Sequence, residues 1–292
     1  MKNTQTIYKK KFGQNFLINE KIINKIIEAS NIQSNSEILE IGPGNGSLTK
    51  EIIKKKPKKF IAIEIDTSLK NIINKEFFKN TDYELIFSDA LKFKEYQKFA
   101  NNFTIISNLP YNISLPLLIK WIYNLDQLPH AHQMILMFQK EVADRILATN
   151  NSKKFGRISV LCSAFFEIKK ITDVDKNDFF PVPKVNSTVL MFKTLKSFKF
   201  NIKDIKYLEK ITNILFNNRR KKLKKKIETL FSPTVIEENM LNRYYDYRVE
   251  NLTAEIFFKL AALIKSNWDH SKIFRLPFIR KNNLFYLLNA FV

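Results

Sequence analysis

Three of the five glycines in this chain lie within five residues, at Gly42, Gly44 and Gly46, directly after the apolar run 38–41. A strand that ends in closely spaced glycines predicts a sharp turn into a helix, because glycine adopts left-handed backbone angles without strain. The unpaired N–H groups at the start of that helix suit a ligand that approaches the backbone closely. No Lys-Ser or Lys-Thr pair closes the turn, which argues against a phosphate loop and against nucleotide triphosphate hydrolysis. A turn that serves structure alone remains the alternative.

The first two-thirds of the chain alternates short apolar runs with helical patterns, which is typical of a parallel sheet covered by helices. Strands are expected at 38–41, 60–65, 84–87, 103–107, 133–138, 165–174 and 187–192. Helices are expected at 19–29, 48–55, 68–78 and 115–125, where apolar residues recur at helical spacing. No helical pattern separates the last two strands, so we expect them to form an antiparallel pair at one edge of the sheet.

After about residue 195 the pattern changes to helices alone. They are expected at 205–216, 222–230, 235–242 and 253–265. The 292 residues are 45% hydrophobic and suffice for two cores. We therefore expect an α/β domain at 1–195, a small helical domain at 196–265, and a tail at 266–292 that has no clear period and stays unassigned.

The formal net charge of +21 favours a polyanionic partner such as nucleic acid or an anionic surface. AT-rich codon usage is the alternative explanation, because only eight of the 49 basic residues are arginine. The distribution of charge is the better evidence, since the segment 219–226 carries seven cations in eight residues. A run this dense repels itself unless counter-charges bind it.

Metal, disulfide and membrane chemistry are not expected. The chain has one cysteine, Cys162, and three histidines, too few for a disulfide or a zinc site. No apolar stretch approaches the ~20 residues of a membrane span, and the first residues lack the apolar core of a signal peptide. We expect an intracellular protein without membrane contact.

An acidic residue lies near the end of the second expected strand, and another follows the third. Glu64 lies about twenty residues beyond the glycine turn, where a doubly wound sheet places a carboxylate that can accept both hydroxyl hydrogens of a ribose. A dinucleotide or an adenosyl ligand would satisfy it equally. Asp89 could accept a hydrogen bond from the exocyclic amine of an adenine, or it could cap a helix, and both interpretations stay open.

The fourth expected strand ends in Asn108-Leu109-Pro110-Tyr111. This stretch resembles the catalytic motif of amino-methyltransferases that act on adenine, cytosine or glutamine amides, and the Asn-Ile-Ser that follows narrows the resemblance to RNA adenine dimethyltransferases. The segments 11–17, 139–145, 155–160 and 179–187 resemble further blocks of the bacterial small-subunit (16S) ribosomal RNA adenine N6-dimethyltransferase family. The segments 216–223 and 248–252 resemble that family more than the enzymes that dimethylate an adenine of large-subunit RNA.

The resemblance covers residues 10 to about 263. It implies a Rossmann-like class I methyltransferase sheet with a small C-terminal all-helical domain, and S-adenosylmethionine as cofactor. The implied reaction is dimethylation of two adjacent adenosines in a 3′-terminal hairpin loop of 16S rRNA, in the small subunit or its precursor. A cytoplasmic monomer active in ribosome biogenesis is implied as well. The block 224–226 is more uniformly basic than the family pattern.

The resemblance also implies roles for individual residues. The catalytic residues that it implies are Asn108, Leu109, Pro110, Tyr111 and Phe180. The cofactor-binding residues that it implies are Asn15, Leu17, Gly42, Gly44, Glu64, Asp89 and Asn108. The RNA-binding residues that it implies are Arg219, Arg220, Lys221, Lys222 and Arg248.

In the mechanism we expect, the side-chain oxygen of Asn108 and the backbone carbonyl of Pro110 accept the two amine hydrogens of the target adenine. Tyr111 and Phe180 stack on the two faces of the base. Two alternatives are a non-catalytic RNA-binding assembly factor, which predicts degraded cofactor residues, and a DNA adenine methyltransferase, which usually carries Asp where this chain has Asn108.

Overall fold

The computed structural model describes residues 14–70, 73, 82–99, 102–127 and 131–267. The tail beyond 267, most of the expected helix 68–78 and the first three residues of the motif 11–17 lie outside this part of the chain. The chain divides into two compact units, one formed by 1–143 with 167–194 and the other by 144–166 with 195–292. No helix of the described residues is long and apolar enough to cross a membrane.

A seven-stranded sheet in the order β4-β3-β2-β5-β6-β9-β7 forms the centre of the first unit. Its strands are β2 (Glu37–Ile41), β3 (Lys59–Glu64), β4 (Tyr83–Phe87), β5 (Phe103–Ser107), β6 (Ala131–Gln139), β7 (Phe166–Val174) and β9 (Ser187–Thr194). The first five pair in parallel, and β9 pairs antiparallel with β6. The expected α/β class is confirmed, and the last two expected strands are neighbours at one sheet edge.

The strand order reverses direction at β2, because β3 and β4 follow on one side of it and β5 and β6 on the other. A crevice forms outside the carboxyl ends of the strands at such a switch point, and ligands bind there. The glycine turn follows β2, and Asn108 follows β5. The topology therefore brings the two motifs together at one end of the sheet.

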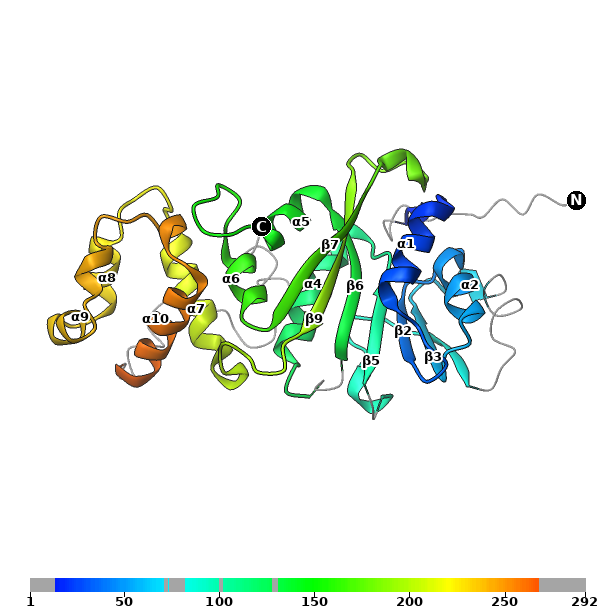
Figure 1. The fold of residues 1–292 in the computed structure, drawn as a ribbon, viewed down its shortest axis with the longest axis horizontal. Helices are drawn as coiled ribbons and strands as arrows, with labels where there is room; N and C mark the ends of the chain where they lie inside the picture. The colour runs from blue at the N-terminus through cyan, green and yellow to red at the C-terminus, as the bar shows by residue number, and fades with distance from the viewer. Residues whose placement is uncertain (1–13, 71–72, 74–81, 100–101, 128–130, 268–292) are drawn as a thin grey trace, which may run out of the picture. The chain divides into compact units, whose positions relative to one another are not determined.

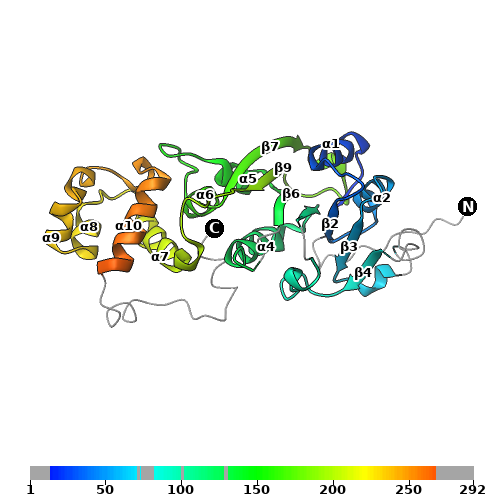
Figure 2. The ribbon, with the colours of Figure 1, turned by 60° about the horizontal axis from the view of Figure 1, so that its bottom comes forward.

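Helices cover both faces of this sheet. α1 (Glu20–Ser30) and α2 (Ser47–Lys54) lie on one face, and α4 (Tyr111–Tyr123) lies on the other (Figure 1; Figure 2). Asn19 caps α1 by accepting a hydrogen bond from the backbone N–H of Lys21 at 2.9 Å. The apolar residues Ile22, Ile23 and Ile26 of α1 pack into the main hydrophobic cluster. Burying each such side chain contributes roughly 1.5–3 kcal/mol.

Helix α4 begins at Tyr111, four residues before the expected start at residue 115. The expected start rested on the helical spacing of apolar residues, which is indistinct in a helix that is buried on all sides. The helix is buried from Ser114 to Ile122, and Pro116 lies in its interior. The helix therefore starts immediately after Pro110, within the motif itself.

A second sheet of two short strands pairs β1 (Phe16–Leu17) antiparallel with β8 (Phe179–Phe180). Phe16 lies opposite Phe180, and Leu17 lies opposite Phe179. Strands of two residues leave no periodic pattern in a sequence, and neither one was expected. The pairing joins the segment expected to cover the cofactor to the segment expected to stack on the base.

The second unit is helical over its described residues. Its helices are α6 (Arg157–Ser163), α7 (Ile205–Phe216), α8 (Lys224–Leu230), α9 (Pro233–Glu238) and α10 (Ala254–Asn267), while α5 (Lys140–Leu147) runs across residue 143, where the first unit gives way to the second in sequence. The rings of Phe155, Phe216 and Phe257 form a cluster with centroids 5.4–6.3 Å apart. This cluster packs the segment 144–166 against the C-terminal helices. Short 3-10 helices are η2 (Thr67–Leu69), η3 (Glu95–Gln97), η4 (Lys176–Asp178), η5 (Ile202–Asp204), η6 (Leu241–Tyr244) and η7 (Val249–Asn251).

Candidate active site

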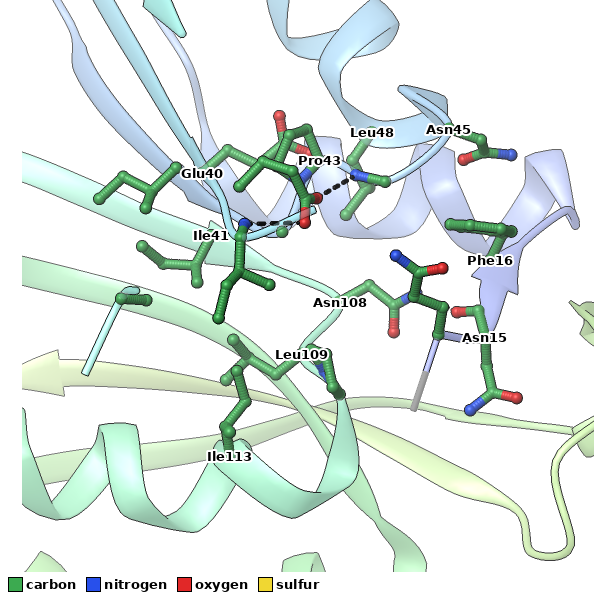
Figure 3. A pocket seen from close by; sticks show the side chains of 18 of the residues that line it. Asn15, Phe16, Glu40, Ile41, Pro43, Asn45, Leu48, Asn108, Leu109 and Ile113 are labelled. Atoms are coloured by element: carbon green, nitrogen blue, oxygen red, sulfur yellow. Dashed lines mark hydrogen bonds between the residues drawn. The ribbon is translucent and has the colours of Figure 1, made fainter. Parts of the chain in front are cut away.

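A pocket lies at the carboxyl ends of the strands β2, β3, β4 and β5. Figure 3 shows side chains of Asn15, Phe16, Pro43 and Asn108 around it. All seven residues expected to bind the cofactor line this pocket, as do the four residues of the motif 108–111. Its remaining walls come from Gln14, Phe16, Glu40, Ile41, Pro43, Asn45, Ser47, Leu48, Ile63, Ile65, Ser88, Ala90, Asn112 and Ile113.

The glycine turn forms one wall of the pocket, and its backbone requires glycine. Gly42, Gly44 and Gly46 have φ of 68°, 58° and 82°, which L side chains rarely adopt. A Cβ atom on Gly44 would also lie 2.8 Å from Cε1 of Phe16. The turn therefore gives a bound molecule access to bare backbone, with the Phe16 ring packed against it.

Glu64 holds the glycine turn in place. One oxygen of its buried carboxylate accepts the backbone N–H groups of Ile65 and Asp66, both at 2.9 Å, and the other accepts that of Gly44 at 3.2 Å. Burial raises the pKa of Glu64, while these three N–H groups act to lower it. An ionised carboxylate has about four acceptor positions, so one remains for a ribose hydroxyl rather than the two expected from the sequence.

Asp89 caps the backbone with one carboxylate oxygen, and the other has no donor among the described residues. Its Oδ1 accepts the backbone N–H of Leu91 at 2.9 Å, which caps a turn rather than a helix. No described residue donates to its second carboxylate oxygen, and Asp89 lines the pocket. One oxygen is therefore structural, and the other remains as an acceptor for a ligand.

The amide of Asn108 is oriented by the N-terminal segment. Its Nδ2 donates to the backbone carbonyl of Asn15 at 2.9 Å. The hydroxyl of the preceding residue, Ser107, donates to the carbonyl of Ile41 and so ties the end of β5 to the end of β2. Because the amide nitrogen is bonded, the side-chain oxygen of Asn108 is the atom left to accept a hydrogen from a substrate amine.

The carbonyl of Pro110 was expected to accept the second amine hydrogen, but hydrogen bonds within the protein already occupy it. It accepts the backbone N–H groups of Ile113 at 3.0 Å and Ser114 at 3.1 Å, because it is the first carbonyl of α4. The carbonyl of Leu109 accepts no hydrogen bond from the described residues. A substrate amine at Asn108 would therefore find its second acceptor at Leu109 rather than at Pro110.

The two expected stacking residues are held in different ways. The hydroxyl of Tyr111 lies 2.6 Å from Oγ of the buried Ser187, at the start of β9. Burial raises the pKa of Tyr111, so the phenol stays protonated at neutral pH. Phe180 does not line the pocket and is 56% exposed, but β8 places it directly across from Phe16, which does.

Comparison with known proteins identifies the family. The family model described as ribosomal RNA adenine dimethylase matches residues 6–266. The chain belongs to the ribosomal RNA adenine dimethylase family. Ribosomal RNA small subunit methyltransferase A of Pelagibacter ubique (strain HTCC1062) is 41% identical over 252 residues, which cover 86% of this chain and 95% of that protein.

Two solved structures resemble this member of the dimethylase family. A dimethyladenosine transferase from Plasmodium falciparum has a TM-score of 0.71 at 28% identity, and the match covers 86% of this chain and 98% of that one. The 23S rRNA methyltransferase ErmE has a TM-score of 0.67 at 20% identity, covering 86% of this chain and all (100%) of that one. The second likeness shows a shared fold alone, and both agree with the expected class I methyltransferase architecture.

In this dimethylase, two of the five residues expected to bind RNA are paired within the second unit. Arg219 donates from Nε to Glu250 at 3.1 Å and from Nη1 to the carbonyl of Lys153 at 2.9 Å. Lys222 lies 2.7 Å from Asp246. These acidic partners offset two of the seven cations of the dense basic run, so most of its charge remains for an external anion.

None of the other three residues expected to bind RNA has an acidic partner among the described residues. The side chains of Arg220 and Lys221 have no acidic or hydrogen-bond partner among the described residues. Arg248 is fixed through its backbone N–H, which donates to Oδ1 of Asn251 at 2.8 Å. Arg220 and Lys221 are therefore available to a phosphate, as is the exposed Lys225 of the same run.

Glu40 is a pocket residue to which sequence analysis gave no role. It lines the pocket with 1% of its surface exposed, and its Oε2 accepts the hydroxyl of Thr49 at 2.7 Å. Burial raises its pKa to about 8, although the Thr49 hydrogen bond acts to lower it. An acidic residue inside the apolar strand before Gly42 was the signal available in the sequence. Such a carboxyl ionises more readily when a cation binds beside it.

Proposed function

We propose that this chain transfers methyl groups from S-adenosylmethionine to the N6 amines of two adjacent adenosines in a 3′-terminal hairpin loop of 16S rRNA. The observation that carries the proposal is the arrangement of Asn108, whose amide nitrogen is bonded to Asn15 and whose oxygen is left as an acceptor at the pocket. The small subunit is chosen because the relative at 41% identity is named for it.

The pocket fits the proposed cofactor. When bound, S-adenosylmethionine supplies a methyl group on a sulfonium, which is already an activated leaving group. In this proposal the turn at Gly42 and Gly44 holds the methionine portion, and the free acceptor position of Glu64 holds the ribose. The free oxygen of Asp89 receives the amine of the cofactor adenine. Asn15 and Leu17 cover the site.

The adenine amine is a poor nucleophile because its lone pair is delocalised into the ring. Acceptance of its two hydrogens by the Asn108 side chain and the Leu109 carbonyl would draw the nitrogen towards tetrahedral geometry and aim its lone pair at the methyl group. The transfer then depends on alignment more than on acid or base catalysis. Pro110 contributes by fixing the chain between Leu109 and the first turn of α4.

The target base must leave its stack to enter the site. Tyr111 and Phe180 would then stack on its two faces, each contributing roughly 1–3 kcal/mol. After the first transfer one amine hydrogen remains, so the second transfer requires the half-methylated base to rotate or rebind. The neutral phenol of Tyr111 suits this role, because it brings no charge next to the base.

The basic residues of the second unit supply the affinity for RNA in this proposal. Contacts from Arg219, Arg220, Lys221, Lys222 and Arg248 to phosphates would position the RNA without reading its sequence, with the largest share from Arg220 and Lys221. The catalytic domain would then be the expected 1–195 without the segment 144–166, which belongs to the second unit and would join 196–265 in the RNA-binding domain. One copy carries every residue that the reaction needs, so we propose a monomer, acting in the cytoplasm where small subunits assemble.

The deciding experiment measures transfer of labelled methyl groups to small ribosomal subunits that lack adenine dimethylation. The intact protein is expected to yield dimethyladenosine, and Asn108→Ala and Tyr111→Ala are expected to yield little. Subunits that already carry the modification are the control and should accept no label. Tight binding to subunits without any transfer would overturn the proposal in favour of a non-catalytic assembly factor.

A further inference from the structure

A buried lysine on α4 holds the segment that follows β4. Nζ of Lys120 donates to the backbone carbonyls of Ala90 at 2.7 Å and Phe93 at 2.6 Å, and to the two carboxylate oxygens of Glu95 at 2.8 and 3.0 Å. The side chains of Lys120 and Glu95 are 9% and 1% exposed. An ammonium group has three hydrogens, and each of them has an acceptor here.

The next residue of the helix joins the same network. The indole Nε1 of Trp121 donates to Oε1 of Glu95 at 2.7 Å, and its ring is buried. Replacing a buried ion pair by apolar side chains of the same volume is often neutral or stabilising, so a pair like this one is weak evidence of a stabilising role. The hydrogen bonds from Lys120 to two backbone carbonyls and to Glu95 indicate instead that the pair fixes the position of the backbone of residues 90–95.

One end of this network lies at the pocket, and the other lies on the helix that begins there. Ala90 lines the pocket and follows Asp89, which has one carboxylate oxygen free. Helix α4 begins at Tyr111, so Lys120 lies on the helix that starts within the motif 108–111. Lys120 therefore connects the carboxylate expected to receive the cofactor adenine with the helix that presents the acceptors for the target adenine.

We propose that Lys120 is a positioning residue, which sets the place of Asp89 relative to Asn108 and so fixes where the adenosine end of the cofactor lies. This inference rests on the proposed function, because it takes S-adenosylmethionine to be the ligand of the pocket. Lys120 touches no reacting atom and acts through the Asp89 segment. Glu95 and Trp121 hold it in that role.

The first test is the affinity of the full chain for S-adenosylmethionine, measured by calorimetry for the wild type and for Lys120→Met. The dissociation constant is expected to rise about tenfold, as befits the loss of hydrogen bonds from a charged group. Lys98→Met is the matched control, because Lys98 pairs at 3.0 Å with Glu84 near the same segment but at the surface. It is expected to change the constant less than about twofold.

A double-mutant cycle with Asp89→Asn separates positioning from general stability. Asparagine keeps the oxygen that caps the turn but removes the carboxylate. If Lys120 acts through Asp89, Lys120→Met raises the dissociation constant far less in the Asp89→Asn protein than in the wild type. Equal effects in the two backgrounds, or an unchanged constant in a folded Lys120→Met protein, would overturn the inference. The KM for the cofactor should rise while the KM for the ribosomal subunit stays constant.

Further variants keep the test decisive if Lys120→Met does not fold. Trp121→Phe keeps an aromatic side chain but removes the N–H group together with the five-membered ring, and Lys120→Arg keeps the charge. Both are expected to raise the dissociation constant less than Lys120→Met, and an unchanged constant in folded Trp121→Phe would then overturn the inference. A wild-type protein that fails to bind the cofactor would instead count against the proposed function.

Discussion

The pocket of the first unit and the basic run 219–226 of the second differ in how much their sequences reveal. In the pocket, Glu64, Asp89 and Asn108 each use part of their hydrogen-bonding capacity within the protein and keep one acceptor for a ligand. In the basic run, Arg219 and Lys222 are paired with acidic residues more than 20 positions away. The position of a motif at a strand end indicates its geometry. A run of charges does not indicate which of its side chains are free to bind a ligand.

The largest effect is expected from Asn108→Ala, which tests whether the pocket residues act as proposed. Removing one positioned group that stabilises developing charge costs about 100- to 1000-fold in kcat, and a loss of this size is expected in the methyl-transfer assay. The matched control is Asn102→Ala, because Asn102 precedes β5 at its opposite end and is exposed. Equal activities of the two variants would contradict the assignment.

Gly44→Ala tests whether the turn is built for close approach of a ligand. The substitution forces a side chain into φ of 58° and into contact with Phe16, a strain of roughly 1–3 kcal/mol. We expect a rise of about tenfold in the dissociation constant for S-adenosylmethionine. Gly156→Ala is the control, because its Cβ would meet nothing closer than 3.8 Å. Unaltered cofactor affinity for Gly44→Ala would contradict the expectation that the glycine turn is built for close approach of a ligand.

The basic run is tested by two double variants that remove the same charge. Arg220→Ala with Lys221→Ala should reduce the slope of log affinity for RNA against log salt by about 2, because two phosphate contacts are lost. Arg219→Ala with Lys222→Ala should change the slope less and lower the free energy of unfolding slightly, chiefly through loss of the Arg219–Glu250 pair, because the Lys222–Asp246 pair is exposed. The same slope for both variants would show that the intramolecular pairs open when RNA binds.

The smallest effect is expected from Ser187→Ala, which removes the partner of the Tyr111 hydroxyl. One such hydrogen bond contributes about 1 kcal/mol, so kcat/KM for the ribosomal subunit should fall about fivefold while cofactor affinity is unchanged. Ser30→Ala is a suitable control, since that serine is also buried but bonds the carbonyl of Ile27 in its own helix. A loss of cofactor affinity would indicate that Ser187 supports the whole pocket.

The sequence by itself determined the α/β class, the strand ends that carry the motifs, and the expected cofactor-binding residues that meet at the pocket. The physical reason is that parallel strands place their carboxyl ends at one edge, so residues that follow different strands become neighbours. Helices with a clean apolar period were also predictable, and α7 has the bounds that its pattern indicates. In α4 nearly every residue is buried, so the apolar residues show no distinct helical period. The expected start of this helix is therefore four residues too late.

The tertiary structure decided what depends on partners distant in sequence. The pairing of β1 with β8, the bond from Asn108 to Asn15 and the bond from Tyr111 to Ser187 leave no local pattern. The same holds for the helix bonds that occupy the Pro110 carbonyl and leave that of Leu109 available. A sequence names the groups that can donate and accept, but only the packed chain shows which of them are already satisfied.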